Sequence, residues 1–324
     1  MADRQIPEAD RGRDASRPGD IPGVGWRDVI LRVKRRIVED HLSIVAAGAA
    51  FYALLATFPA LSALFGIYRL IFDPRQMSEQ LSSLQGELAP EALQLLLVMV
   101  QSLEQSQPWR LMLGVGGGLL VALWGASLGV RALMKALNVA YDEKEKRSFV
   151  ARIGVALLLT VGAIAVASIA IAAVIGVPAA LHLLPLKPLP RTLLVYVRWP
   201  VVTAIFWLSL SVLYRYGPSR ELARWPWVSW GALTATVLWL GGSALISWYV
   251  SSFASFDKAY GSMGFVVVLL VWFLLSAYSV LVGAEINAEL ERQTHKDTTV
   301  GVDRPVGQRG AKVADTIGKS PAGS

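Results

Sequence analysis

The residues best suited to chemistry in this 324-residue chain lie where long apolar stretches end. Glu285 and Asn287 follow a charge-free run, within the sequence GAEINAEL, and Glu289 lies one helical turn beyond Glu285. Arg198 lies near the start of another apolar run. Ionisable groups at membrane depth are costly and often mark substrate or proton paths. Arg198, Glu285 and Asn287 are therefore candidates for a substrate path.

A simpler interpretation of the same residues stays open. Arg198 can extend its guanidinium to the lipid headgroups, and Glu285 can cap a helix at the membrane surface. The positions of these two residues predict opposite faces of the membrane, so we do not expect them to form an ion pair.

Other kinds of reactive site find little support in the sequence. The chain has no cysteine, which excludes disulfides, thiolate metal ligands and thiol nucleophiles. Its three histidines, His41, His182 and His295, are far apart and lack the spacing of metal ligands. There is no GxxxxGK(S/T) motif, so the chain has no ATPase domain of its own to drive transport. We therefore expect no cofactor, no metal and no catalytic residue.

Nuclease activity can be tested against the same sequence. Cleavage of nucleic acid requires clustered carboxylates that hold two metal ions, or a histidine pair for acid–base catalysis, beside a basic groove. Here the carboxylates are scattered through tails and short loops, and membrane topology already accounts for the excess of Lys and Arg. We expect neither an enzyme nor a nucleic-acid partner.

The composition is that of a membrane protein. Hydrophobic residues make up 54% of the chain and charged residues only 17%, whereas soluble domains carry about a quarter charged residues. The mean hydropathy is +0.48. The charges cluster and leave long charge-free runs between them, as expected where lipid replaces water. The first 25 residues are polar and contain no apolar core of a cleavable signal peptide.

Six apolar runs predict an all-α bundle of six transmembrane helices, since about 20 helical residues cross a hydrocarbon core of about 30 Å. The predicted spans are residues 42–68, 111–130, 153–175, 193–214, 227–251 and 263–284. Pro59 lies in the middle of the first span and predicts a kink, which either builds a cavity or fits the helix around its neighbours. The fourth span is the least regular, because Arg198 and Pro200 lie near its start.

The distribution of Lys and Arg predicts the orientation of these spans. With both termini in the cytoplasm, the cytoplasmic segments hold 24 Lys and Arg residues and the outer segments hold 7. Cytoplasmic loops of membrane proteins carry an excess of these residues. The pattern therefore predicts a multi-pass protein of the inner membrane with both termini in the cytoplasm.

Several segments outside the spans have patterns of their own. Residues 1–25 and 293–324 lack apolar periodicity and predict disordered tails. Residues 26–40 form a basic amphipathic pattern that suits the cytoplasmic membrane surface. Two more surface helices are predicted, one outside the membrane after Pro90 and one in the cytoplasm from Leu133 to Tyr141. The loop DKAYGSMG is more typical of a tight structural turn than of a binding site: its residues Tyr260, Gly261 and Gly264 suit a headgroup anchor and a re-entry into the last span.

The chain resembles the YihY/virulence factor BrkB family of bacterial inner-membrane proteins, some of which have carried a ribonuclease BN label. The resemblance covers roughly residues 26–292 and rests on the order and spacing of four segments. These are AAGAAFYALLATFPALSALFGIYRL (46–70), LWGASLGVRALMKALNVAYDEKEKRSF (123–149), LYRYGPS (213–219) and AYGSMGFVVVLLVWFLLSAYSVLVGAEINAELER (259–292). It implies a six-span protein with a role in transport or in envelope integrity, and it implies no particular substrate.

Two functions are compatible with these features. The first is a transporter-like or lipid-handling protein whose partners are membrane lipids, although no pair of inverted repeats is evident. The alternative is a non-catalytic membrane scaffold that organises envelope-assembly proteins through its surface helices and tails. The substrate, the energy coupling, the direction of transport and the oligomeric state stay open.

Overall fold

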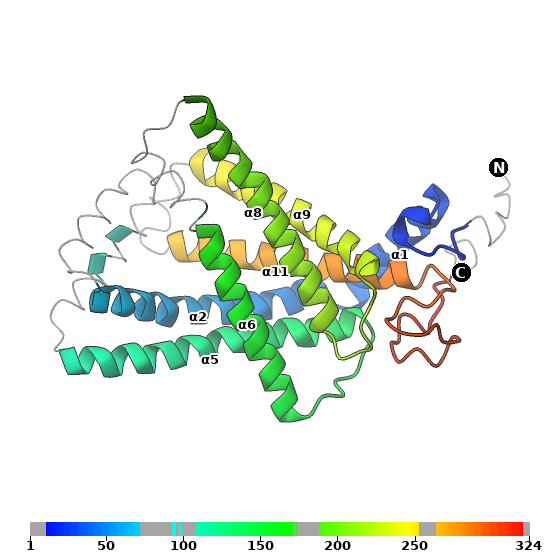
Figure 1. Ribbon diagram of the computed structural model, residues 1–324, viewed down its shortest axis with the longest axis horizontal. Helices are drawn as coiled ribbons and strands as arrows, with labels where there is room; N and C mark the ends of the chain where they lie inside the picture. The colour runs from blue at the N-terminus through cyan, green and yellow to red at the C-terminus, as the bar shows by residue number, and fades with distance from the viewer. Residues whose placement is uncertain are drawn as a thin grey trace. The chain divides into compact units, whose positions relative to one another are not determined.

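The computed structural model describes residues 11–71, 93–94, 97–98, 108–171, 173, 188–252 and 264–319. Over these residues the fold is all-helical, as predicted, and Figure 1 shows its helices. A short 3-10 helix, η2 (Pro18–Asp20), comes first. The α-helices are α1 (Gly23–Glu39), α2 (Leu42–Ile71), α5 (Pro108–Ala140), α6 (Phe149–Ile171), α8 (Pro188–Tyr216), α9 (Trp225–Ser252) and α11 (Gly264–Glu291).

Four helical segments are long and apolar enough to cross a membrane. They are Phe149–Ala170, Tyr196–Tyr216, Trp225–Ser252 and Gly264–Glu291, and they correspond to the last four predicted spans. A fifth is added if α1 and the first part of α2, which meet at an angle of 64°, are counted as one broken span. The chain is thus a helical membrane protein, and the count of six spans stays a prediction.

Three helices differ in extent from the sequence-based boundaries. The cytoplasmic surface helix predicted from Leu133 is not a separate element, because α5 continues without a break through the second predicted span to Ala140. No proline interrupts residues 131–140, so nothing in the local sequence ends the helix there. The helix α8 begins five residues before the predicted span 193–214 and ends two residues after it, and like that span it includes Pro200. The helix α11 extends seven residues past the predicted end at residue 284.

The helix predicted at the cytoplasmic membrane surface, α1, is only partly free to contact lipid. Val29 and Val33 on its apolar face are buried in a cluster with Trp227 and Leu290. Its opposite side leaves Ile30 and Val38 exposed. The amphipathic pattern therefore reflects contact with the protein as much as contact with a membrane. The surface helix predicted after Pro90 lies mostly outside the described residues.

The chain divides into two compact units, and α2, α5, α9 and α11 contribute residues to both. The unit of residues 47–130 and 241–276 has closely packed small residues, as predicted for helices in lipid. A Cβ atom added to Gly125 would lie 3.3 Å from the Cβ of Ala56. In the same unit the indole N–H of Trp272 donates to the hydroxyl of Ser243 at 3.1 Å.

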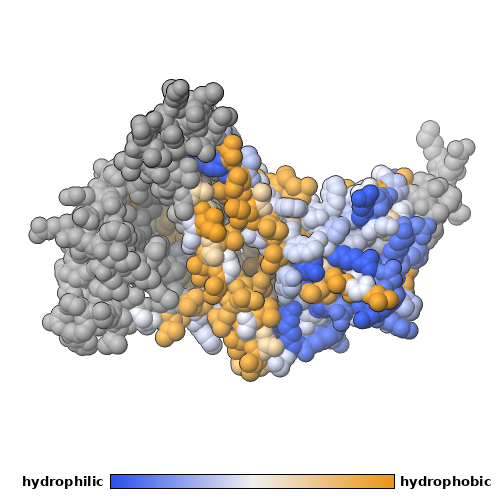
Figure 2. Space-filling view, in the orientation of Figure 1, coloured by the Kyte–Doolittle hydropathy of each residue, from blue (hydrophilic) through white to orange (hydrophobic). Residues whose placement is uncertain are grey.

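The other unit, of residues 1–46, 131–240 and 277–324, contains the polar interior. Its apolar core joins the ends of α5, α8, α9 and α11, and it includes Leu137, Tyr141, Tyr214 and Val228. The hydroxyl of Tyr214 donates to the backbone carbonyl of Val280 at 2.7 Å, which ties α8 to α11. Figure 2 shows hydrophobic residues over α6 and α8 of this unit, and hydrophilic residues over its α1 and C-terminal segment.

The described parts of both tails differ from the disordered tails that their composition predicts. Residues 292–319 form an irregular segment beside the end of α11 (Figure 1). Arg13 donates to the carbonyl oxygens of Gln293 and Gly318, at 3.3 and 2.7 Å, and so joins the two tails. A prediction of order from composition depends on apolar residues that form a core. In these tails buried arginines take that role, because each donates hydrogen bonds to several backbone carbonyls.

Candidate functional site

The last two turns of α11 carry a row of buried polar side chains. Glu285 and Asn287 are fully buried, and Glu289 and Glu291 are each 1% exposed. Long acidic side chains are almost never buried unless they are paired. Each of these four residues therefore requires a partner from another element, and the elements that supply the partners define the site.

Asn287 joins α11 to α9. Its side-chain oxygen accepts a hydrogen bond from the backbone N–H of Gly231 at 2.7 Å, and its side-chain nitrogen donates to the carbonyl of Val228 at 3.1 Å. Both hydrogen-bonding ends of the amide are thus used by the backbone of α9. Asn287 has a structural role here, which the path hypothesis did not foresee.

Glu289 is the centre of an ion-pair cluster. Its carboxylate lies 2.5 Å from Nε of Arg32 on α1 and 3.8 Å from Nε of Arg36, and it also pairs with Arg292. Asp142, which follows α5, accepts hydrogen bonds from Arg36 at 3.1 Å and from Arg292. The cluster therefore fastens α1 and the end of α5 to α11.

Glu285 lies beside this cluster but takes no part in its hydrogen bonds. Both of its carboxylate oxygens are buried and lack a hydrogen-bond partner among the described residues. Oδ2 of Asp40, in the turn between α1 and α2, is also buried without one. The charges that act on Glu285 come from Asp40, Glu289, Arg292 and Arg36. Glu285 is thus a sequence-predicted candidate whose buried carboxylate has no hydrogen-bond partner in the described structure.

A second buried ion pair closes the end of α11. The guanidinium of Arg220 donates two hydrogen bonds to the two oxygens of Glu291, at 2.9 and 2.6 Å. The hydroxyl of Thr298 adds a third bond to Glu291, at 2.6 Å. Arg220 also lies over the ring of Tyr141, 5.0 Å from its centroid. Although burial alone lowers the pKa of Arg220, the charge and the hydrogen bonds of Glu291 raise it, so the guanidinium stays charged.

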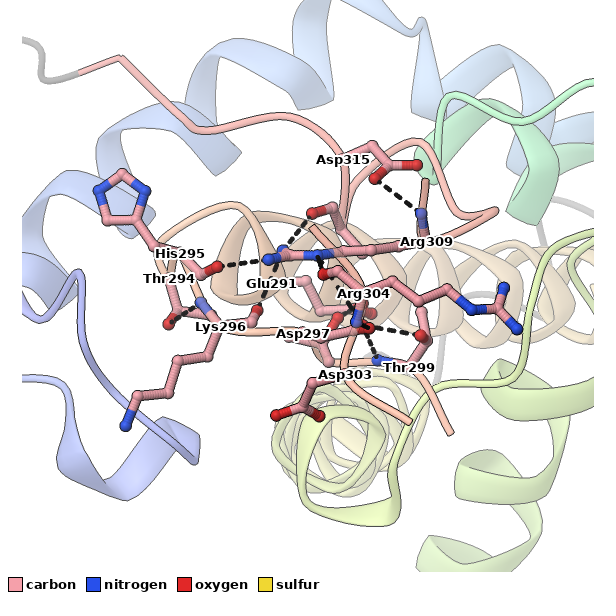
Figure 3. A network of polar contacts seen from close by, with 12 residues as sticks. Glu291, Thr294, His295, Lys296, Asp297, Thr299, Asp303, Arg304, Arg309 and Asp315 are labelled. Carbon is pink, nitrogen blue, oxygen red and sulfur yellow. Dashed lines mark hydrogen bonds and ion pairs between the residues drawn. The ribbon is translucent and has the colours of Figure 1, made fainter. Parts of the chain in front are cut away.

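The C-terminal segment folds around two polar centres, shown in Figure 3. Arg309 donates to the backbone carbonyls of His295, Lys296, Arg304 and Ala314. The carboxylate of Asp297 accepts from the N–H and the hydroxyl of Thr299, at 2.9 and 2.7 Å, and from the N–H of Arg304 at 2.9 Å. These hydrogen bonds fix the conformation of the C-terminal segment, which has no regular secondary structure.

The second of these centres makes the segment sensitive to acid. Burial alone raises the pKa of Asp297, but the hydrogen bonds from Thr299 and Arg304, together with the charge of Arg309, hold it below its ordinary value of 3.8. A carboxylate whose folded pKa is lowered stabilises the folded state above its unfolded pKa, and this contribution is lost as the pH falls through the folded value. At neutral pH we expect amide hydrogen exchange in residues 297–309 to be faster in Asp297→Asn than in the wild type.

That difference between the two proteins should shrink as the pH falls below 3.8. The exposed carboxylate of Asp303 provides a matched control, since Asp303→Asn should leave the protection of these amides nearly unchanged at every pH. A difference between wild type and Asp297→Asn that persists undiminished in acid would contradict the prediction.

The other sequence-predicted positions are not members of this cluster or lie outside the described residues. Arg198 is half-buried on α8, and its guanidinium lies 5.4 Å from the ring centroid of Trp199. Position 59 lies within α2, and the kink at Pro59 stays a prediction. Gly264 is the first residue of α11, as its predicted place at a re-entry requires. Tyr260 and Gly261 lie outside the described residues.

Sequence reasoning missed the residues that face Glu285 and Glu289. The basic amphipathic pattern of residues 26–40 assigns Arg32 and Arg36 to the membrane surface, and the helix predicted from Leu133 to Tyr141 ends before Asp142. One signal was available, because Glu285, Glu289 and Arg292 recur at helical spacing and predict one polar face. The partners from other segments are more than a hundred residues away in the chain, and no local pattern connects them.

The described cluster is suited to holding charge rather than a metal. No group of three or more His, Asp or Glu side chains within the described ranges is placed to bind a metal ion. Every guanidinium of the cluster already contacts Glu289 or Asp142. The buried polar atoms of the described cluster that lack a hydrogen-bond partner are both carboxylate oxygens of Glu285, Oδ2 of Asp40 and Nη1 of Arg32. A proton or a cationic group would satisfy the carboxylate of Glu285.

Four long apolar helical segments, one of which ends in a buried ionic cluster, define a helical membrane protein. Residues 33–305 match the family described as virulence factor BrkB, and the chain belongs to that family. It is 31% identical, over 259 residues, to the ribonuclease-like protein YfkH of Bacillus subtilis, which covers 76% of this chain and 90% of that protein. It is 24% identical to a UPF0761 membrane protein of Psychromonas ingrahamii, over 81% of this chain and 87% of the relative.

A further UPF0761 membrane protein, from Idiomarina loihiensis, is 28% identical over 55% of this chain and 61% of its own length. No solved structure matches the chain.

Proposed function

We propose that this protein moves or handles lipids, or a similar substrate, in the bacterial inner membrane, and so supports the integrity of the cell envelope. Both termini lie in the cytoplasm in this proposal, and no catalytic step takes place. The observation that carries the proposal is Glu285, which is fully buried where the charge-free part of α11 ends and whose two oxygens lack partners in the described structure.

A buried carboxylate without a partner is costly, since its desolvation is not compensated. At the edge of a membrane such a group fits a path for a proton or for a cationic part of a substrate. The amine of a phospholipid headgroup has the required charge. Glu289 does not offer the same opportunity, because Arg32 and Arg292 already neutralise it.

The surface of α1 supports contact between the protein and lipid. Lys34 and Arg35 lie on one exposed face of this helix together with Leu31, Val38 and Glu39. Cations beside exposed apolar side chains suit the boundary between anionic headgroups and acyl chains. Because α1 also supplies Arg32 and Arg36 to the cluster at α11, a lipid bound at this surface would contact the helix that borders Glu285.

Reconstitution in liposomes tests the proposal. The purified full-length chain is inserted into vesicles that contain a fluorescent phospholipid, and a membrane-impermeant quencher reports how much of that lipid moves between leaflets. We expect movement above that of empty vesicles, and slower movement with Glu285→Gln. Glu221→Gln is the matched control, because Glu221 is an exposed carboxylate of the same unit and should leave the rate unchanged.

Movement no faster than in empty vesicles would overturn the lipid-handling proposal. Equal rates for wild type, Glu285→Gln and Glu221→Gln would remove Glu285 from the path.

A further inference from the structure

We propose that Glu285 and Asp40 share a single proton and that this carboxyl pair is the proton-binding site of the protein. The inference deepens the proposed function, on which it rests, because it makes the proton the ion whose binding is linked to substrate movement. It begins from two acidic side chains on different elements, one on α11 and one between α1 and α2, that face one another in the described structure.

The geometry of the pair is the first argument. The carboxyl of Asp40 lies within hydrogen-bonding reach of that of Glu285. Two ionised carboxylates are both acceptors and cannot form a hydrogen bond with each other. Their three buried oxygens, both of Glu285 and Oδ2 of Asp40, are accordingly without partners when no proton is placed between them. One proton supplies the missing donor and satisfies both side chains.

The charge balance around the pair is the second argument. Four carboxyl groups and three guanidinium groups meet in the described cluster. The acids are Asp40, Asp142, Glu285 and Glu289, and the bases are Arg32, Arg36 and Arg292. If every group were ionised, one negative charge would stay uncompensated in the interior. A single bound proton makes the set neutral.

The placement of the guanidinium groups shows where that proton belongs. Arg32 contacts Glu289 at 2.5 Å, and Arg292 pairs with both Glu289 and Asp142. Arg36 lies 3.1 Å from Asp142 but 3.9 Å from Asp40. Glu39, the neighbour of Asp40, is exposed and lies 3.5 Å from Arg35. The cations are thus committed to Glu289 and Asp142, which leaves Glu285 and Asp40 as the pair that requires the proton.

The surroundings also allow the proton to be exchanged. The buried hydroxyl of Tyr141 lies within reach of the side chain of Asn287, and the charges of Glu291 and, more weakly, Glu285 act on it. Asp40 is 15% exposed at its side chain, whereas Glu285 is fully buried. The pair therefore extends from the protein surface to the end of the apolar part of α11, as a proton-binding site on a path requires.

Infrared difference spectroscopy of the full-length protein in lipid nanodiscs tests the inference. A protonated carboxyl group gives a C=O band that a carboxylate lacks, and deuterium exchange shifts it. At neutral pH we expect this band in the wild type and in Glu221→Gln. We expect it to be lost in both Glu285→Gln and Asp40→Asn, because removal of either carboxyl leaves three acidic and three basic groups in the cluster, whose charges balance without a bound proton.

The outcomes separate the inference from the proposed function. If the wild type shows no protonated-carboxyl band at neutral pH, the inference of a shared proton is overturned. This outcome does not depend on whether the variants fold. A band that survives in Asp40→Asn but not in Glu285→Gln overturns the pair and assigns the proton to Glu285 alone. If the band behaves as expected while the vesicles show no lipid movement, the proton site stands and the lipid-handling proposal fails.

Discussion

Replacing Arg220 with methionine is expected to lower the free energy of unfolding by about 3–5 kcal/mol, because it leaves the buried carboxylate of Glu291 without its cation. The side chains of Arg220 and Glu291 are 2% and 0% exposed. The two charge-assisted hydrogen bonds between them are lost together, and only the bond from Thr298 stays. The measurement is denaturant-induced unfolding of the purified protein in mixed micelles, followed by circular dichroism.

An exposed arginine pair provides the control for this substitution. Arg17 lies 3.1 Å from Asp20, and its side chain is 73% exposed. Arg17→Met makes the same chemical change and should cost far less stability than Arg220→Met, because solvent screens this exposed pair. The double variant Arg220→Met/Glu291→Leu should recover much of the stability lost in Arg220→Met, since it removes the uncompensated charge. Equal losses for Arg220→Met and Arg17→Met would show that burial does not strengthen this pair.

The sequence predicts the apolar parts of this fold well because they are local. The predicted span 227–251 lies within α9, and residues 264–284 of the span predicted at 263–284 lie within α11, since a charge-free run of this length has no alternative in lipid. The same rule ends α11 too early, at the first charged residue. Glu285, Glu289 and Glu291 continue the helix because other segments of the protein replace water around them.

The polar site could not be predicted from the sequence, because its contacts connect distant segments. Arg32 and Glu289 are 257 residues apart, and Arg292 and Asp142 are 150 residues apart. The tails illustrate the same limit. Arg13 and Arg309 lie in stretches whose composition predicts disorder. Both donate hydrogen bonds to backbone carbonyls and so order the described residues of the tails, and amino-acid composition does not reveal these bonds. Glu285 was found as a candidate because its signal, a charge at the end of an apolar run, is local.

Glu285 and Asn287 also show why position alone does not define a functional residue. Both follow the same apolar run, and both are fully buried. Asn287 is satisfied by the backbone of α9, whereas Glu285 has no hydrogen-bond partner in the described structure. The distinction rests on hydrogen bonding, and it separates a residue that joins two helices from one that can bind a proton or a cation.

The joint between α9 and α11 is expected to be the position where the smallest substitution has the largest effect. A Cβ atom added to Gly231 would lie 2.0 Å from the carbonyl oxygen of Gly283 and 2.5 Å from the side chain of Asn287. The oxygen belongs to the backbone of α11, so the two helices must move apart. Overpacking costs about 1–3 kcal/mol, and breaking the buried bonds of Asn287 costs a similar amount.

We therefore expect Gly231→Ala to lower the free energy of unfolding by about 3 kcal/mol or more. Gly241→Ala is the matched control, because Gly241 lies on the same helix and a Cβ atom there would meet nothing within 4 Å. Alanine is the better helix former, by up to about 1 kcal/mol, so this variant should be as stable as the wild type or slightly more stable. Unfolding of both variants under the conditions used for Arg220→Met gives the comparison. If Gly231→Ala and Gly241→Ala have the same free energy of unfolding, close contact between the backbones of α9 and α11 is not required for stability. The hydrogen bonds of Asn287 then tolerate a greater separation of the two helices.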